Sequence, residues 1–103
     1  MTNKIQVFSE YKIKNNDTNS YEKAMDAVIA RLKEDGARNI QWYKSVDQNN
    51  LYVEMYEVDS MDDYNRIKVL RKSSVEERYK DIHPFIEGDA EKLHMWAFAT
   101  VKK

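Results

Sequence analysis

The 103-residue chain contains no cysteine, one proline and two glycines. Without cysteine it has no disulfide bond, no thiolate nucleophile and no cysteine-ligated metal site. With Gly36 and Gly88 as its only glycines, it also lacks the glycine-rich loop that holds phosphates in nucleotide-binding proteins. These scarcities exclude cysteine-based catalysis, cysteine-ligated metal sites and glycine-rich phosphate loops. The absence of cysteine is also compatible with an intracellular, cytoplasmic protein.

The chain also lacks a dominant charge and a long apolar run. Its 17 lysines and arginines nearly balance 18 aspartates and glutamates, for a net charge of -1, and the two signs are interleaved. No broad basic field is present to neutralise phosphates, so nucleic acid is not an expected partner. No segment approaches the ~20 apolar residues of a membrane span. Because Met1-Thr2-Asn3-Lys4 lacks the apolar stretch of a secretory signal, we expect a soluble protein with no membrane partner.

Apolar residues follow two periods that predict the order of the secondary structure. A period of two predicts strands at 4–14, 40–46, 51–58 and 92–101. Apolar spacings of three and four predict a helix from Tyr21 to the capping Gly36 and a second helix that begins after Ser60. The predicted order is therefore β-α-β-β-α-β, in a single domain spanning residues 1–103.

The second helix is expected to be long and interrupted. Ser73-Ser74, followed by two glutamates, resembles a second N-cap that bends or restarts the helix. The buried stripe is expected to continue through Val75, Tyr79 and Ile82. Pro84 disfavours helical geometry in the preceding residue, so the helix is predicted to end at His83.

The strands at 51–58 and 92–101 are apolar on both faces. In the first, Tyr52, Tyr56 and Val58 alternate with Leu51, Val53 and Met55, and only Glu54 and Glu57 are charged. The element order predicts an α+β, ferredoxin-like fold, in which two helices cover one face of a four-stranded antiparallel sheet. The other face would expose more apolar surface than monomers usually tolerate. We therefore expect a homodimer whose two sheets pack face to face as a dimeric α/β barrel and bury ~1,000 Å² or more.

Two segments carry a resemblance to a known family. They are Val53-Glu54-Met55-Tyr56-Glu57, followed by Ser60 and Tyr64, and the closing strand His94-Met95-Trp96-Ala97-Phe98. With them the whole chain resembles the dimeric α/β-barrel superfamily, near the antibiotic-biosynthesis-monooxygenase-like (ABM-like) domains. The resemblance implies a ligand pocket between the sheet and the helices of each subunit. Some relatives oxygenate polycyclic phenols without a cofactor, others degrade haem, and many have no known activity.

The chain departs from the haem-degrading relatives at the residues that matter. Those relatives use an asparagine in the first strand and a tryptophan and a histidine in the second helix. This chain has Ser9 in the first strand, and its second helix has no tryptophan and no histidine before His83. Haem degradation is therefore disfavoured and no cofactor is expected. The chain has only two histidines, and they do not form a metal-binding spacing motif, so no metal site is expected.

The two histidines are the candidate catalytic residues. The predicted helix C-terminus beside His83 would raise its pKa and suit it as an acid or base. A polar cap on the helix end is the alternative interpretation. His94 shares a strand face with Trp96 and Phe98 and would serve as a base or ligand in an aromatic pocket. Pairing of His94 with a nearby carboxylate is equally ordinary.

Aromatic residues provide the candidate ligand-binding set, which comprises Tyr56, Tyr64, Trp96 and Phe98. They could stack a small apolar or aromatic ligand, although such residues more often form a core or a dimer interface. A basic cluster on the second helix, made of Arg66, Lys68, Arg71 and Lys72, is interpreted as a solvated face rather than an anion site.

Two function classes remain open. The first is a small enzyme, monooxygenase-like or isomerase-like and free of cofactors, with His94 or His83 as base. The second is a non-catalytic binding or regulatory dimer. A closed apolar pocket reached by a histidine would favour the enzyme, and a pocket plugged by tryptophan and tyrosine side chains would favour the binding protein.

Overall fold

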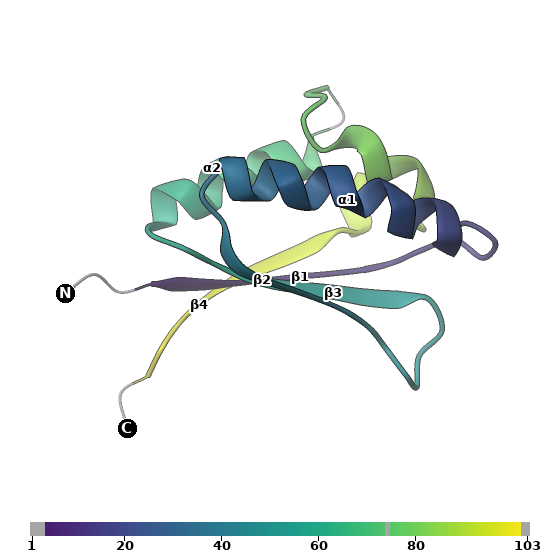
Figure 1. Ribbon diagram of the computed structural model, residues 1–103, viewed down its shortest axis with the longest axis horizontal. Helices are drawn as coiled ribbons and strands as arrows, with labels where there is room; N and C mark the ends of the chain where they lie inside the picture. Colours follow the sequence, from purple (N-terminus) through teal and green to yellow (C-terminus); the bar gives the residue numbers. More distant parts are fainter. Residues whose placement is uncertain (1–3, 74, 102–103) are drawn as a thin grey trace.

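Two layers make up the structure, a computed structural model that describes residues 4–73 and 75–101. One layer is a four-stranded sheet of β1 (Ile5–Lys12), β2 (Arg38–Lys44), β3 (Leu51–Val58) and β4 (His94–Ala99). The other layer contains α1 (Thr18–Glu34), α2 (Met61–Lys72) and two short 3-10 helices, η1 (Lys80–Phe85) and η2 (Ala90–Lys92) (Figure 1). The predicted order of strands and helices is confirmed.

The sheet has the strand order β2-β3-β1-β4, with all neighbours antiparallel. This order is that of a ferredoxin-like fold, as predicted. β3 has the predicted bounds, whereas the other three strands differ from the prediction by one or two residues at each end. Because the Ser45 hydroxyl accepts the Gln48 N–H, the hairpin turn begins early, β2 ends at Lys44, and Val46 is fully exposed. At the other end of the chain, β4 begins at His94 because Lys92 belongs to η2.

The core lies between the inner face of the sheet and the two α-helices. On β3 every second residue is buried, as a period of two requires. The helices contribute Tyr21, Met25, Val28 and Leu32 from α1, and Tyr64 and Ile67 from α2. The apolar periods in the sequence therefore identify the buried faces of these elements correctly.

The predicted continuation of the second helix to His83 is wrong. α2 ends at Lys72, and the next residue, Ser73, is extended (φ -76°, ψ 131°). The Ser73 hydroxyl does accept backbone N–H groups, from Val75 and Glu76, but no α-helix follows and Val75 is exposed. The other half of the proposed cap, Ser74, lies outside the described residues.

Pro84 lies inside η1 rather than after a helix end. A short 3-10 helix tolerates proline because few of its N–H groups have a partner within the helix. Tyr79, at the N-cap of η1, and Ile82, within it, are both buried, so this part of the predicted stripe is confirmed.

Asp35, at the C-terminal end of α1, anchors the segment that leads into η1. Its carboxylate accepts a hydrogen bond from Arg78 Nε at 2.8 Å and another from the Tyr79 hydroxyl. Arg31 of α1 pairs with Asp81 of η1. Burial opposes ionisation of Asp35, but the bonds from Arg78 and Tyr79 prevail and lower its pKa. These contacts hold η1 against α1.

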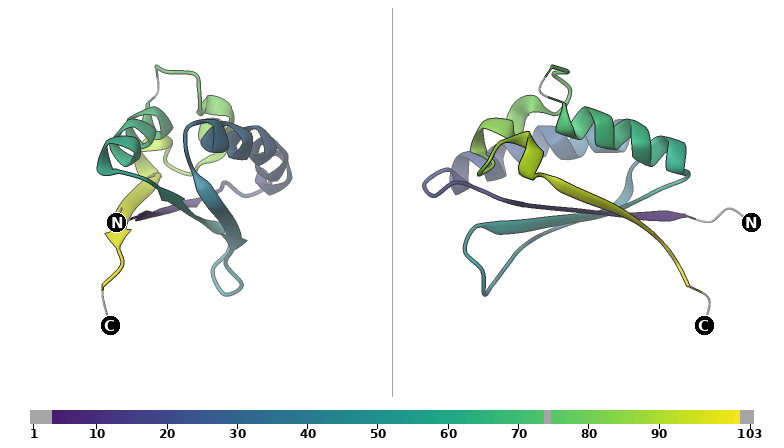
Figure 2. Two further views of the ribbon diagram at one scale, coloured as in Figure 1. Left: turned by 60° about the vertical axis from the view of Figure 1, so that its left-hand side comes forward. Right: turned by 180° about the vertical axis from the view of Figure 1, so that it is seen from behind.

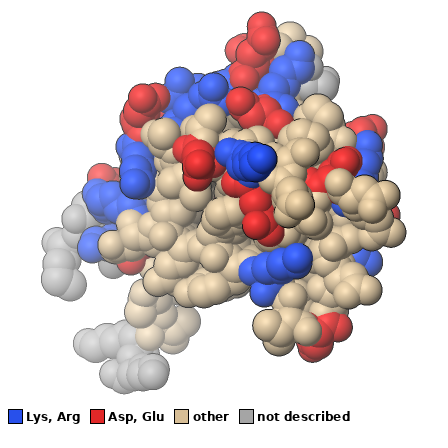
Figure 3. Space-filling view, turned by 45° about the vertical axis from the view of Figure 1, so that its right-hand side comes forward, with Lys and Arg blue, Asp and Glu red and all other residues tan. Residues whose placement is uncertain are grey.

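Within residues 4–73 and 75–101, no helix or strand covers the face of the sheet opposite the helices (Figure 2). This face carries Phe8, Tyr43, Val53, Met55, Trp96 and Phe98, of which Tyr43, Trp96 and Phe98 are 50%, 44% and 51% exposed. Charged side chains of both signs are interleaved over the helix layer, whereas uncharged residues dominate the lower left of Figure 3, toward the sheet. Within the described residues, the helices are too short or too polar to cross a bilayer.

Candidate functional site

Arg71 of α2 and Glu54 of β3 form a fully buried ion pair between the sheet and the helices. Arg71 Nη1 and Nη2 lie 2.7 and 2.9 Å from Oε1 and Oε2 of Glu54, and neither side chain is exposed. The interpretation of Arg71 as part of a solvated basic face is therefore wrong. Tyr64, Ile67 and Arg71 succeed one another at spacings of three and then four residues. This spacing places Arg71 on the buried stripe of α2.

A directed chain of hydrogen bonds ends at the Glu54 carboxylate. Trp42 Nε1–H donates to the Tyr21 hydroxyl at 2.9 Å. The Tyr11 and Tyr21 hydroxyls are 2.6 Å apart, and Tyr11 donates to Glu54, so Tyr21 must donate to Tyr11. Burial and the negative charge of Glu54 raise the pKa of both tyrosines, which stay protonated as donors.

These side chains occupy the layer in which the resemblance implied a ligand pocket. The largest fully buried side chains of the protein include Arg71, Tyr11, Tyr21, Tyr52, Tyr56 and Tyr79. Burial also raises the pKa of Tyr56 to about 12, although the Arg71 guanidinium opposes this. Tyrosine, arginine and glutamate thus fill much of the space between sheet and helices in this chain.

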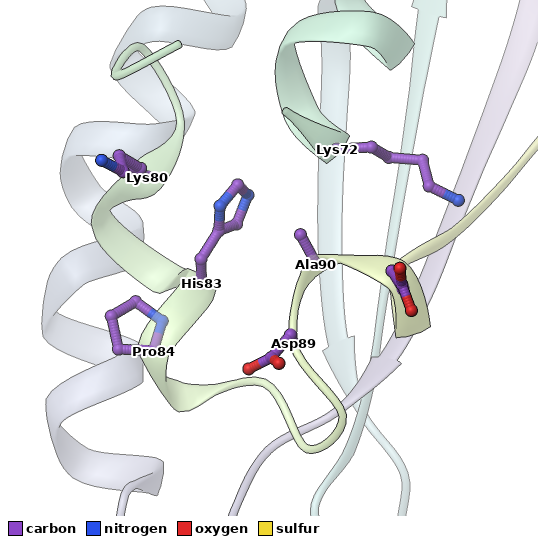
Figure 4. Close-up of a pocket in the computed structure, with 7 residues that line it drawn as sticks. Lys72, Lys80, His83, Pro84, Asp89 and Ala90 are labelled. Carbon is purple, nitrogen blue, oxygen red and sulfur yellow. The ribbon is translucent and has the colours of Figure 1, made fainter. Parts of the chain in front are cut away.

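A cavity of about 510 Å³ opens at the end of the helix layer, between the C-terminus of α2, η1 and η2 (Figure 4). We call it the His83 pocket. It is lined by Lys72, Lys80, His83, Pro84, Asp89, Ala90 and Glu91. Within the described residues, no three histidine, aspartate or glutamate side chains come close enough to share a metal ion.

His83 is held in one orientation at the wall of this pocket. Its Nε2 lies 2.6 Å from the carbonyl oxygen of Arg71. Because a carbonyl only accepts, Nε2 carries the proton and Nδ1 is unprotonated in the neutral ring. The predicted rise in the pKa of His83 is wrong: burial lowers it and outweighs the bond to Arg71. The half-buried imidazole is therefore neutral at pH 7, and it caps the end of α2.

The remaining candidate residues are distributed over both faces of the sheet. Tyr56 and Tyr64 are buried in the core. His94, Trp96 and Phe98 lie on the uncovered face, where the His94 and Trp96 rings stack with centroids 6.0 Å apart. His94 lines a separate cavity of about 340 Å³ beside Glu10 and Lys92. The structure therefore does not bring the two histidines and the aromatic residues into one site.

The buried ion pair was missed in the sequence, although both of its positions carry a signal. Alternation that turns Tyr52 and Tyr56 inward also turns Glu54 inward. Charged residues are almost never buried without a partner. An inward glutamate on a central strand and an arginine on the buried stripe of a helix are therefore a pair that the patterns could have suggested.

The geometry described above defines the class of fold: a ferredoxin-like βαββαβ domain with a four-stranded antiparallel sheet. No protein-family model matches the sequence, and no curated protein matches it. The fold-level part of the resemblance is confirmed by solved structures.

A "putative antibiotic biosynthesis monooxygenase" from Caulobacter crescentus is 17% identical, with a TM-score of 0.72, over 98% of this chain and 92% of that one. SnoaB, a cofactor-independent oxygenase from Streptomyces nogalater, is 9% identical, with a TM-score of 0.71, over 98% of this chain and 96% of that one. A NIPSNAP family protein of unknown function from Agrobacterium tumefaciens is 18% identical, with a TM-score of 0.66, over 96% and 89%. At these identities the likeness shows a shared fold.

Removing either partner of the buried ion pair should be strongly destabilising. Glu54→Leu leaves an unpaired buried guanidinium and Arg71→Met an unpaired buried carboxylate, so each should lower the free energy of unfolding by ~3–5 kcal/mol. The double variant should lose less than either single variant. Urea unfolding followed by tryptophan fluorescence measures this. Glu57→Gln, on the other face of β3, is the matched control and should cost about 1 kcal/mol or less. Additive losses in the double variant would contradict the account.

Stability should fall as the pH decreases below about 6.5, where the unfolded histidine takes up a proton. The pKa of His83 is lower in the folded protein than its unfolded value of about 6.5. The unfolded chain therefore takes up the proton first, and the contribution of His83 is complete above pH ~6.5 and is lost below it. His83→Gln should show a shallower decrease in the free energy of unfolding, measured in urea at several pH values. An unchanged slope would contradict the assignment. The Asp35 contribution is lost only below about pH 4 and does not interfere.

Proposed function

We propose that the protein is a homodimer, with one domain per subunit, that binds a small molecule and does not oxygenate it. One observation carries the proposal: the space between sheet and helices is occupied by the Glu54–Arg71 pair and the tyrosines bonded to it. A flat substrate would have to displace a buried ion pair to enter. Neither histidine reaches this space, because His83 lines the pocket at the helix end and His94 faces away from the helices.

The uncovered face of the sheet supports the dimer. Phe8 of β1 and Phe98 of β4 pack edge to face there, with ring centroids 5.6 Å apart, and Trp96 lies next to Phe8 across the β1–β4 pairing. Met55 pairs with Phe8 from the β3 side. A second copy of the same face would cover this apolar strip and bury ~1,000 Å² or more. In this arrangement Trp96 and Phe98 are interface residues.

A cofactor-free monooxygenase is the second candidate. The observation that favours it is a set of buried polar atoms without a hydrogen-bond partner, namely Ser9 Oγ, the Tyr56 hydroxyl and Arg71 Nε. Such atoms are uncommon in protein interiors, and a substrate oxygen could satisfy them if the interior opened. The solved oxygenase SnoaB shares the fold, which keeps this candidate relevant.

Trp96→Glu should weaken the dimer by about 30-fold or more, because it introduces a charge at the centre of an apolar interface. Light scattering coupled to gel filtration over a dilution series measures the subunit number. Val69→Glu is the matched control: Val69 is 67% exposed on α2, away from the uncovered sheet face, and its substitution should leave the dimer unchanged. A wild-type protein that is monomeric at micromolar concentration would contradict the proposed homodimer.

Oxygen uptake distinguishes the two candidate functions. With a dihydroxynaphthalene as a polycyclic phenol, we expect an oxygen electrode to record the same uptake with and without the protein. Protein-dependent uptake that is lost in Tyr56→Phe would favour the monooxygenase, because this variant removes only the unpartnered phenol oxygen of the interior.

A further inference from the structure

The His83 pocket gathers charged side chains of both signs that are not paired with each other. Lys72 and Lys80 bring two positive charges to its wall, and Asp89 and Glu91 bring two negative ones. None of these side chains belongs to an ion pair formed among residues 4–73 and 75–101. Elsewhere on the helix layer the charges do pair, as in Arg31–Asp81 and Arg78–Asp35. The pocket therefore offers charges of both signs to a ligand.

His83 adds a neutral acceptor to this set. Its Nε2–H is used by the Arg71 carbonyl, which leaves Nδ1 as the acceptor. A hydrogen-bond donor on the ligand, such as an ammonium group, would satisfy it. His83 comes from η1 and Asp89 from the turn before η2, and Figure 4 shows these two side chains and Lys80 on the same side of Ala90, with Lys72 on the other. His83 and Asp89 thus lie on the side of the pocket opposite Lys72, and Lys80 lies on their side.

Asp89 has a backbone conformation that aspartate rarely adopts. Its φ of 66° and ψ of -171° fall in a region that is essentially restricted to glycine. Its side chain makes no capping hydrogen bond to η2 and no ion pair with a described residue. Neither of the usual structural roles of aspartate explains a strained residue at this position. A carboxylate retained against this strain, at the wall of a cavity, indicates a ligand contact.

We propose that the His83 pocket binds a small zwitterionic molecule, one that carries both an ammonium and a carboxylate group. Asp89 and the Nδ1 atom of His83 hold the ammonium group, and Lys72 holds the carboxylate. The proposal rests on the proposed function, since it identifies the ligand class of that small-molecule-binding dimer. The pocket volume of about 510 Å³ is within the range of small-molecule sites.

The charge balance of the lining favours a zwitterion over a simple ion. Two lysines and two acidic residues cancel, and His83 is neutral. A simple anion would meet Asp89 and Glu91 as well as the lysines, and a simple cation would meet the lysines as well as the carboxylates. A ligand with both charges, placed apart, makes favourable contacts with each set.

Three probes of equal chain length test the ligand class: 4-aminobutyrate, which is zwitterionic, butyrate, which is only anionic, and butylamine, which is only cationic. Each is titrated into the full-length ¹⁵N-labelled protein and followed by amide chemical shifts. We expect 4-aminobutyrate to shift the signals of residues 80–92 and to bind at least about tenfold more tightly than either analogue. Equal binding of butyrate, or no shift with any probe, would overturn the proposal.

Variants of Asp89 separate ligand binding from folding. Asp89→Asn keeps the side-chain shape but removes the charge, and should weaken 4-aminobutyrate binding about tenfold. Asp89→Gly relieves the backbone and should maintain or raise the midpoint of thermal unfolding while weakening binding to the same extent. A lower midpoint in Asp89→Gly, or unchanged affinity in either variant, would show that Asp89 serves the fold instead.

Lysine variants test the carboxylate contact. Lys72→Met should weaken 4-aminobutyrate binding about tenfold and should not weaken butylamine binding. Lys23→Met, at an exposed position of α1 outside the pocket, is the control and should bind as the wild type does. These readouts are independent of subunit number and oxygen uptake. A protein that is dimeric and inert toward phenols but does not bind 4-aminobutyrate would therefore overturn this inference and leave the proposed function standing.

Discussion

The interior of this protein depends on one interaction, the buried ion pair between Glu54 and Arg71. A guanidinium and a carboxylate lose their hydration together, and the two parallel hydrogen bonds between them compensate only while both are present. The pair joins α2 to β3, and Tyr11, Tyr21 and Trp42 extend it toward α1 and β2. The two layers are thus joined by polar contacts as well as by apolar packing.

Arg71 also connects this interior to the pocket at the helix end. Its side chain binds Glu54, while its backbone carbonyl accepts a hydrogen bond from His83 Nε2–H. The position of His83 is further secured because Asp81 of η1 pairs with Arg31 of α1 and, just before η1, Arg78 pairs with Asp35 at the end of α1. With its interior occupied in this way, the protein has its outer surfaces left for the two contacts that we propose: the sheet face for a second subunit and the His83 pocket for a ligand.

The shared fold therefore accommodates more than one arrangement of function. SnoaB, a cofactor-independent oxygenase, has the same topology, yet at 9% identity its name carries no information about the side chains of this interior. Those side chains decide whether a cavity exists between sheet and helices. Here tyrosines and an ion pair occupy that space, and among the described residues Ser9 Oγ, the Tyr56 hydroxyl and Arg71 Nε are buried there without a hydrogen-bond partner.

The sequence by itself determined the order of the elements, the buried faces of β3 and α1, and the uncovered apolar face of the sheet, because periods of two and of 3–4 residues follow directly from local backbone geometry. It did not determine the end of α2, where Ser73 has capping chemistry but an extended backbone. Nor did it determine which charged residues meet. Glu54 and Arg71 lie in separate elements, as do His83 and Asp89, and no local pattern encodes a distance between side chains in different elements. Only the packing of α2 on the sheet, and of η1 beside η2, brought each set together. The same packing decides the direction of the His83 pKa shift, because burial of the imidazole is the largest cause of that shift.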